Sequence, residues 1–129
     1  MKIIKAIPLS EVNGIKFGAK REEVRKVFGE AKEFKKTSFS KTTTDDFGFC
    51  HVYYNVNDEF EAIEIFNEVD VKINDVIVFP NNDISVLKSM FADFEDDEDG
   101  TICKSQSIGV YAPDGEMECI LFGCIGYYE

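Results

Sequence analysis

The sequence predicts an α+β fold: two tandem β-α-β-β-β units that share one antiparallel or mixed sheet, with both helices on one face. The first observation is that residues 14–28 and 76–90 align without a gap. Both segments read as a short strand, a tight turn and an amphipathic helix. The second is that residues 51–63 and 109–120 share a Val-Tyr pair followed by Glu-x-Glu-x-Ile. The separation of matched positions falls from 62 to 57 residues, as expected if the second unit has shorter loops.

Length and composition bound the organisation of the chain. With 129 residues, 44% of them hydrophobic, the chain can form one domain with its own core. We therefore expect a single domain over 1–129, with the first repeat at about 14–66 and the second at about 76–122. No apolar run approaches the roughly 18 residues of a membrane span. The first residues read as a strand and not as a signal peptide, so we expect a cytoplasmic protein without membrane contact.

In the first unit, the helix is the best-supported element. Gly18 leads into it, and Glu22 and Glu23 lie in its first turn, where the helix dipole favours acids. Its apolar stripe has helical spacing and consists of Val24, Val27, Phe28 and Ala31. Strands are expected at Lys2–Ile7, Ile15–Phe17, Glu33–Phe39, Phe47–Tyr54 and Glu59–Phe66. The polar segment Lys41–Asp46 is expected to be a loop, and Asn55–Asp58 a turn.

The second unit begins near Val71 and repeats this order. Val76–Phe79 is a strand, and the turn after it offers Asn82 or Asp83 as the N-cap of the second helix. The stripe of that helix is Val86, Leu87, Met90, Phe91 and Phe94. Asp93–Gly100 is expected to be an acidic loop, followed by strands at Thr101–Lys104, Ser107–Ala112 and Glu116–Phe122.

A short strand, then a G-x-x-R/K-x-E-V-x-x-x-F/L-G pattern that opens a helix, then an antiparallel meander, all in tandem, resembles the beta-lactamase-inhibitor-protein-like fold. The residues that carry the resemblance are Gly18, Arg21, Glu23, Val24, Phe28 and Gly29, together with the repeat at 76–90. Members of that group are mostly binding proteins, and the inhibitor that gives the group its name holds its enzyme with the open face of its sheet. The resemblance therefore implies a protein-binding role for the sheet.

The charge of the chain is unevenly distributed. The net charge is −11, but residues 1–41 carry a net +6 and residues 42–129 a net −17. The acidic part would be repelled by phosphate backbones and by anionic lipid, so nucleic acid and membrane surfaces are not expected partners. An acidic surface that only keeps the protein soluble is the alternative interpretation.

Few residues suit catalysis or metal binding. His51 is the only histidine, and Cys50 beside it on a strand would point to the opposite face, so the two cannot form a nucleophile–base pair. The acidic loop at 95–106 fits an EF-hand at its early positions but has Gln106 where the bidentate glutamate belongs. Zinc spacing and glycine-rich phosphate loops are absent, so no cofactor is expected. Cys50, Cys103, Cys119 and Cys124 lack C-x-x-C spacing, and free thiols are expected, with two disulfides as the alternative.

The remaining candidate is an aromatic sheet surface. Alternation along the strands assigns Val52, Val110, Ile63 and Ile120 to a helix-covered core. The opposite face would then carry Phe47, Phe49, His51, Tyr53, Phe60, Phe66, Tyr111 and Met117. Its rim would be acidic, formed by Glu59, Glu61, Glu116 and Glu118. An uncovered face this rich in aromatic residues is typical of a partner site. The alternative is that loops or a dimer mate cover this face, because strands with two apolar faces are commonly buried.

The sequence therefore favours a non-enzymatic, cytoplasmic protein-binding domain of inhibitor or immunity type, whose protein partner is expected to be basic. The alternative is a structural or scaffold domain that homodimerises through the same face. A small hydrolase or thiol enzyme is disfavoured because no group of residues meets the geometric needs of a catalytic site.

Overall fold

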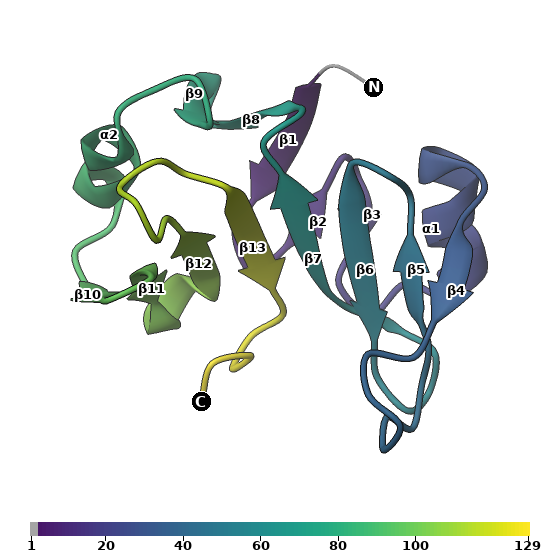
Figure 1. Ribbon diagram of the computed structural model, residues 1–129. Helices are drawn as coiled ribbons and strands as arrows, with labels where there is room; N and C mark the ends of the chain where they lie inside the picture. The colour runs from purple at the N-terminus through teal and green to yellow at the C-terminus, as the bar shows by residue number, and fades with distance from the viewer. Residues whose placement is uncertain (1–2) are drawn as a thin grey trace.

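The chain folds into two β-sheets and two α-helices over residues 3–129, which are the residues that the computed structural model describes (Figure 1). The α+β class expected from the sequence is confirmed. Lys2, the first residue of the expected N-terminal strand, lies outside the described residues.

The smaller sheet has five strands in the order β3-β2-β1-β8-β9. Its strands are β1 (Ile3–Ile7), β2 (Glu11–Val12), β3 (Ile15–Lys16), β8 (Asp70–Ile73) and β9 (Val76–Phe79). The central strand, β1, runs antiparallel to β2 and parallel to β8. Alternate residues of β1 and β8 are buried, which is the pattern of strands with one face in the core.

The larger sheet has eight strands in the order β10-β11-β12-β13-β7-β6-β5-β4, and all neighbours are antiparallel. One half consists of β4 (Lys32–Phe34), β5 (Thr44–Asp46), β6 (Cys50–Tyr54) and β7 (Phe60–Phe66). The other consists of β10 (Phe94–Asp97), β11 (Gly100–Cys103), β12 (Ile108–Tyr111) and β13 (Cys119–Gly123), with a short 3₁₀ turn at Lys104–Gln106. The halves meet where β7 pairs with β13, with Ile65 opposite Ile120.

Helix α1 (Arg21–Phe28) forms where the sequence predicted it. Glu22 and Glu23 lie in its first turn, and the chain leaves the helix at Gly29, whose φ of 97° a glycine adopts without steric cost. Val24 is fully buried, and the ring of Phe28 packs against Phe47 and Phe49 with ring centroids 5.4 Å apart in each case.

Helix α2 (Ile84–Met90) begins after Asp83, whose side chain accepts a hydrogen bond of 2.8 Å from the Ser85 amide. The expected N-cap is thus confirmed at one of its two candidates. Leu87 is the buried residue of this helix, and Lys88 forms an ion pair with Asp96 of β10 at 2.8 Å.

The two sheets differ from the single shared sheet that the sequence predicted. The strands that open each predicted unit, β3 and β9, belong to the smaller sheet with β1. The sequence interpretation missed β8, which pairs with β1 on one side and with β9 on the other and so joins β9 to the smaller sheet. Asn74 and Asp75, both at positive φ, form the tight turn between β8 and β9, and this conformation favours hairpins.

Two strands lie where loops were expected. β5 occupies the end of the polar segment 41–46, and β10 occupies part of the acidic segment 93–100. Both strands contain few apolar residues, so neither shows the alternation of apolar and polar side chains that predicts a strand. β5 is held by the buried side chain of Asp45, and β10 pairs with β11 through four residue pairs.

The core has contributions from both sheets and both helices. Ile63, Ile120 and Val52 are fully buried and Val110 nearly so, which confirms the core assignment made from the repeat. Val24 of α1 and Leu87 of α2 join the same buried cluster as Ile4 and Val71 of the smaller sheet.

Candidate functional site

The larger sheet has one side that faces the core and another that is only partly covered. Cross-strand partners share a side, and the row His51, Glu64, Leu121, Gly109 and Ile102 runs across five strands on the partly covered side. Tyr53, Phe66 and Tyr111 lie on this side as well. We call it the outer face.

On the β4–β7 half, aromatic rings form a row on the outer face. The ring of His51 lies between Phe34 and Phe66, with centroid distances of 5.1 and 4.8 Å. Beside this row, the Tyr53 hydroxyl donates a 3.0 Å hydrogen bond to Glu64, and Lys36 Nζ lies 4.6 Å from the Tyr53 ring centroid. This half of the face is therefore aromatic and carries a cation.

Residues 124–129 lie against part of the outer face. The rings of Tyr127 and Tyr128 pack edge to face with centroids 5.2 Å apart. Each lies over a glycine, because a Cβ atom at Gly123 would meet Tyr127 and one at Gly109 would meet the Tyr128 hydroxyl. Two strand positions without side chains thus provide the space that these tyrosines occupy.

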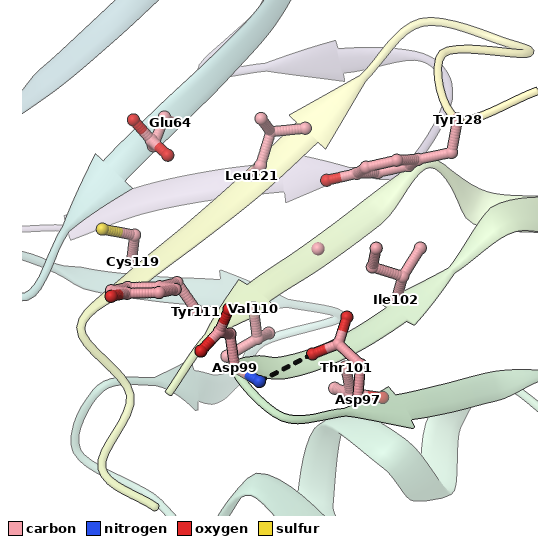
Figure 2. A pocket seen from close by; sticks show the side chains of 11 residues that line it. Glu64, Asp97, Asp99, Thr101, Ile102, Val110, Tyr111, Cys119, Leu121 and Tyr128 are labelled. Atoms are coloured by element: carbon pink, nitrogen blue, oxygen red, sulfur yellow. Dashed lines mark hydrogen bonds between the residues drawn. The ribbon is translucent and has the colours of Figure 1, made fainter. Parts of the chain in front are cut away.

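A pocket of about 170 Å³ remains open on the β10–β13 half of the face (Figure 2). In Figure 2, Tyr111 and Tyr128 stand at opposite sides of it, and Gly109 is among the residues that line it. Carboxylates border it on two sides, with Glu64 on β7 and the pair Asp97 and Asp99 at the turn between β10 and β11. The other lining residues are Thr101, Ile102, Val110, Cys119 and Leu121.

The pocket is negatively charged. Among residues 3–129, no lysine or arginine forms an ion pair with Glu64, Asp97 or Asp99. Burial, together with Glu64 and Glu118, raises the pKa of Cys119 to about 11, so its thiol is neutral at pH 7. Burial also raises the pKa of Tyr128, with contributions from Tyr127 and Glu64. The carboxylates therefore supply the charge of the pocket, and both neighbouring groups are neutral.

The charges at the two edges of the larger sheet have opposite signs. At one edge, β4 and the residues after it carry Lys32, Lys35 and Lys36, all exposed. At the other edge, β10 and its turn carry five consecutive acids, Glu95 to Asp99, all exposed. The acidic pocket lies near the second edge.

The predicted partner-binding residues do not all lie on the outer face. His51, Tyr53 and Tyr111 do, and Tyr111 is 47% exposed. Phe66, also expected there, is present beside His51. Four others, Phe47, Phe49, Phe60 and Met117, are placed elsewhere.

The placement predicted for Phe47 and Phe49 was wrong. Both lie in the connection between β5 and β6, where Gly48 has a φ of 90°, so the alternation of a strand does not apply to them. Their rings pack instead against Phe28 of α1.

The placement predicted for Phe60 was also wrong, because the pairing of β6 with β7 shifts between Tyr53 and Tyr54. The shift places Phe60 opposite Tyr54, on the core side, where it is 1% exposed and stacks on Phe17 at 4.6 Å. Met117 precedes β13 in an irregular segment and is 8% exposed, so it too belongs to the core.

The predicted acidic rim is dispersed. Glu59 lies at the end of the β6–β7 turn, where Asn55 donates to it and Lys20 approaches within 3.6 Å. Glu61 is partly buried at the shift in register, while Glu116 and Glu118 are exposed in the connection before β13. The carboxylates that border the pocket are Glu64, Asp97 and Asp99, which the sequence interpretation did not select.

A buried charge network is the main feature that sequence reasoning missed. The side chain of Asp45 is fully buried and accepts hydrogen bonds from Arg21 at 2.9 Å, from Arg25 at 2.6 Å and from the Tyr54 hydroxyl at 2.8 Å. Arg21 also contacts Asp58 at 2.7 Å, and its guanidinium lies 4.0 Å from the Tyr54 ring centroid. Arg21 and Arg25 are four residues apart, so they lie on the same side of α1, and that side also carries the buried Val24. Two arginines beside a buried apolar residue are the sequence signal that could have predicted a buried acceptor.

The contacts of that network suit a structural role. Burial alone would raise the pKa of Asp45, but hydrogen bonds from Arg25 and Tyr54 and the charges of both arginines outweigh burial and lower it. Within the described residues, no buried side-chain nitrogen or oxygen lacks a hydrogen-bond partner. The fully bonded carboxylate is therefore suited to hold α1 on the sheet.

Other chemistry has little support in the described part of the chain. Over residues 3–129, no group of three or more His, Cys, Asp and Glu side chains could hold a metal ion. All four cysteines are free, and burial raises the pKa of Cys50, Cys103, Cys119 and Cys124 alike. Neither helix of residues 3–129 has the length and apolar character needed to cross a membrane.

Comparison of the chain with protein-family models, with curated proteins and with solved structures finds no match in any of the three.

Proposed function

We propose that this chain is a non-enzymatic, cytoplasmic protein-binding domain of inhibitor or immunity type, which binds its partner with the outer face of the larger sheet. The observation that carries the proposal is the outer face itself. It has partly exposed aromatic side chains, among them His51, Tyr53 and Tyr111, beside carboxylates that have no cation of the described chain as a partner. Aromatic anchors surrounded by polar groups are typical of protein interfaces.

The arrangement of the helices supports this role. Arg21 and Arg25 of α1 contact Asp45, and Lys88 of α2 contacts Asp96. Asp45 pairs with Val52, and Asp96 with Thr101, so both acids belong to the core side by register. We infer two tandem units that place their helices on that side and leave the outer face for a partner. This arrangement is also what the resemblance to the beta-lactamase-inhibitor-protein-like fold implies.

The charge of the chain favours a basic protein over other partners. Nucleic acid and anionic membrane would be repelled by the acidic residues around the pocket and along β10. The alternative, a scaffold domain that homodimerises through the outer face, would bring the acidic pocket of one copy near the other copy. Lys32, Lys35 and Lys36 of that copy are the exposed cations of the larger sheet that could neutralise it.

Affinity capture with matched variants tests the proposal. The bait is the wild-type chain, the Tyr53→Ala/Tyr111→Ala double variant, or a Val27→Ala control that alters an exposed apolar residue of α1. A protein retained by the wild type and the control but lost with the double variant is then purified. Its complex is measured by calorimetry, where we expect the double variant to cost roughly 2 kcal/mol or more of binding free energy.

Three results would count against the proposal. A partner whose affinity is unchanged in the double variant would place binding elsewhere. Self-association of the wild type that Tyr111→Ala abolishes, measured by sedimentation velocity, would establish the scaffold alternative. Turnover of acyl, phosphoryl or glycosyl substrates by the purified chain would show that it is an enzyme.

A further inference from the structure

We propose that the pocket between Tyr111 and Tyr128 is the specificity site of the outer face and receives one arginine side chain of the partner protein. This inference rests on the proposed function and makes it more specific. It names the side chain that the face recognises and the residues of the chain that recognise it.

The size of the pocket fits a single polar head group. The pocket has a volume of about 170 Å³, which suits one planar guanidinium with part of its stem. Gly109 lines the pocket without a side chain of its own, and the Tyr128 hydroxyl lies over it, so this tyrosine forms part of the pocket wall.

The charges around the pocket call for a cation. Glu64 approaches from β7, while Asp97 and Asp99 approach from the β10–β11 turn on another side (Figure 2). One Asp97 oxygen accepts from the Asp99 amide at 2.8 Å, and one Glu64 oxygen accepts from Tyr53 at 3.0 Å. A carboxylate has two oxygens with about four acceptor sites in all, so each of these acids keeps capacity for a further donor.

The aromatic side chains favour arginine over lysine. A guanidinium is planar, stacks on aromatic rings and presents five N–H donors that can pair with carboxylates on more than one side. Two tyrosines at opposite sides of the pocket and carboxylates at its border match that geometry. Lysine would bring a compact charge without the stacking surface.

The test uses NMR titration of the ¹⁵N-labelled chain with three small probes. They are N-acetyl-arginine methylamide, the lysine counterpart and the citrulline counterpart, which has nearly the shape of arginine without its charge. We expect saturable shifts of the Gly109 and Leu121 amides with the arginine probe, weaker shifts with lysine, and none that saturate with citrulline.

Two pairs of variants locate the effect. Asp97→Asn/Asp99→Asn should weaken the arginine probe by roughly fivefold or more, the fold-change that corresponds to about 1 kcal/mol. Asn still accepts the turn hydrogen bond, so the fold should persist. Glu22→Gln/Glu23→Gln on α1 removes the same charge elsewhere and should leave the affinity within twofold.

Tyr111→Phe should keep the preference for arginine over lysine, and Tyr111→Leu should lose it.

Equal shifts with citrulline and arginine would overturn the inference, as would equal losses in the two double variants. So would shifts centred on residues outside the pocket, such as Glu116. If a protein partner binds Tyr53→Ala more weakly but binds Asp97→Asn/Asp99→Asn normally, the proposed function stands and the arginine pocket is rejected. If arginine binds at Gly109 but no protein partner binds the outer face, the arginine pocket stands and the proposed function is rejected.

Discussion

Arg21 of α1 and Asp45 of β5, which are 24 residues apart in sequence, form a 2.9 Å ion pair in which the aspartate side chain is fully buried. Arg25 binds the same carboxylate one helical turn later. The pair joins the first helix to the sheet where the polar sequence of β5 provides little hydrophobic contact. Several consequences can be measured.

Replacing Asp45 should destabilise the fold. Asp45→Ala leaves two guanidinium groups without their shared acceptor, and breaking a buried pair from one side costs roughly 3–5 kcal/mol. Arg21 keeps Asp58 and Arg25 keeps Glu33, so we expect about 3 kcal/mol in the free energy of unfolding by urea. Asp58→Asn is the control, because Asp58 is half exposed and asparagine tolerates its φ of 63°, and it should cost no more than about 1 kcal/mol. Equal losses in the two variants would contradict a dominant role for Asp45.

The same carboxylate should make stability depend on acid. Because the folded state lowers the pKa of Asp45, the folded chain binds this proton less readily than the unfolded chain. Its contribution is present above the ordinary aspartate pKa of about 3.9 and is lost as the pH falls through the lower folded value. Urea unfolding of the wild type and of Asp45→Asn from pH 6 to 2 should show curves that converge at low pH. Parallel curves would contradict this.

Phe60 and Tyr111 should behave in opposite ways. Phe60 is 1% exposed and stacked on Phe17, so Phe60→Ala should lower the free energy of unfolding by roughly 3–5 kcal/mol. Tyr111 is 47% exposed, and Tyr111→Ala should change it by less than about 1 kcal/mol. Thermal melts of the two variants make the comparison. A large loss from Tyr111→Ala would mean that the outer face is part of the core.

Two glycines of the outer face should differ in their tolerance of alanine. At Gly123, a new Cβ would lie 2.6 Å from the Tyr127 Cβ, so the backbone of residues 124–129 would have to move. We expect a loss of about 1–3 kcal/mol, the usual range for overpacking. At Gly109 the obstacle is the far end of the Tyr128 side chain, which can swing aside, so Gly109→Ala should cost less. A reversed order in urea denaturation would contradict the placement of the two tyrosines.

Thiol titration tests the state of the cysteines. The unfolded, unreduced protein should release close to four thiol equivalents, because the structure has four free cysteines. In the native state Cys50 should react slowest, since it is fully buried and its thiol pKa is raised by burial and by Asp46. A count near zero in the unfolded protein would require disulfides and would argue against the proposed cytoplasmic location.

The sequence was informative where side chains repeat with the period of their own element. The buried Val24 of α1, the Asp83 cap of α2 and the core positions Val52 and Ile120 all follow from local patterns. Two other residues of the predicted α1 stripe do not fit, because Val27 is 44% exposed and Ala31 lies beyond the end of the helix. These features depend on neighbours within a few residues, and periodicity reports such neighbours directly.

Long-range pairing was not visible in the same way. β8 joins the smaller sheet because its residues pair with residues of β1 that lie 67 positions earlier, which no local pattern reports. The shift in strand pairing between Tyr53 and Tyr54 reverses the side of the sheet on which Phe60 lies. A single irregularity in pairing cannot be recognised from the amino-acid composition. The pocket likewise depends on Tyr128 returning to Gly109, a contact between residues that are distant in sequence.

The opposite charges at the edges of the larger sheet give the molecule an electric dipole across its strands, with lysines beyond β4 and five consecutive acids at β10. A basic molecule that diffuses toward the protein is attracted by its net negative charge of −11 and also exerts a torque on this dipole. That torque turns a basic segment toward the β10 edge before any side chains touch, and it weakens beyond a screening length of roughly 8 Å at physiological salt. Collisions in the wrong orientation are then corrected during approach, so the orientation of the encounter is set partly by the ionic strength of the solution.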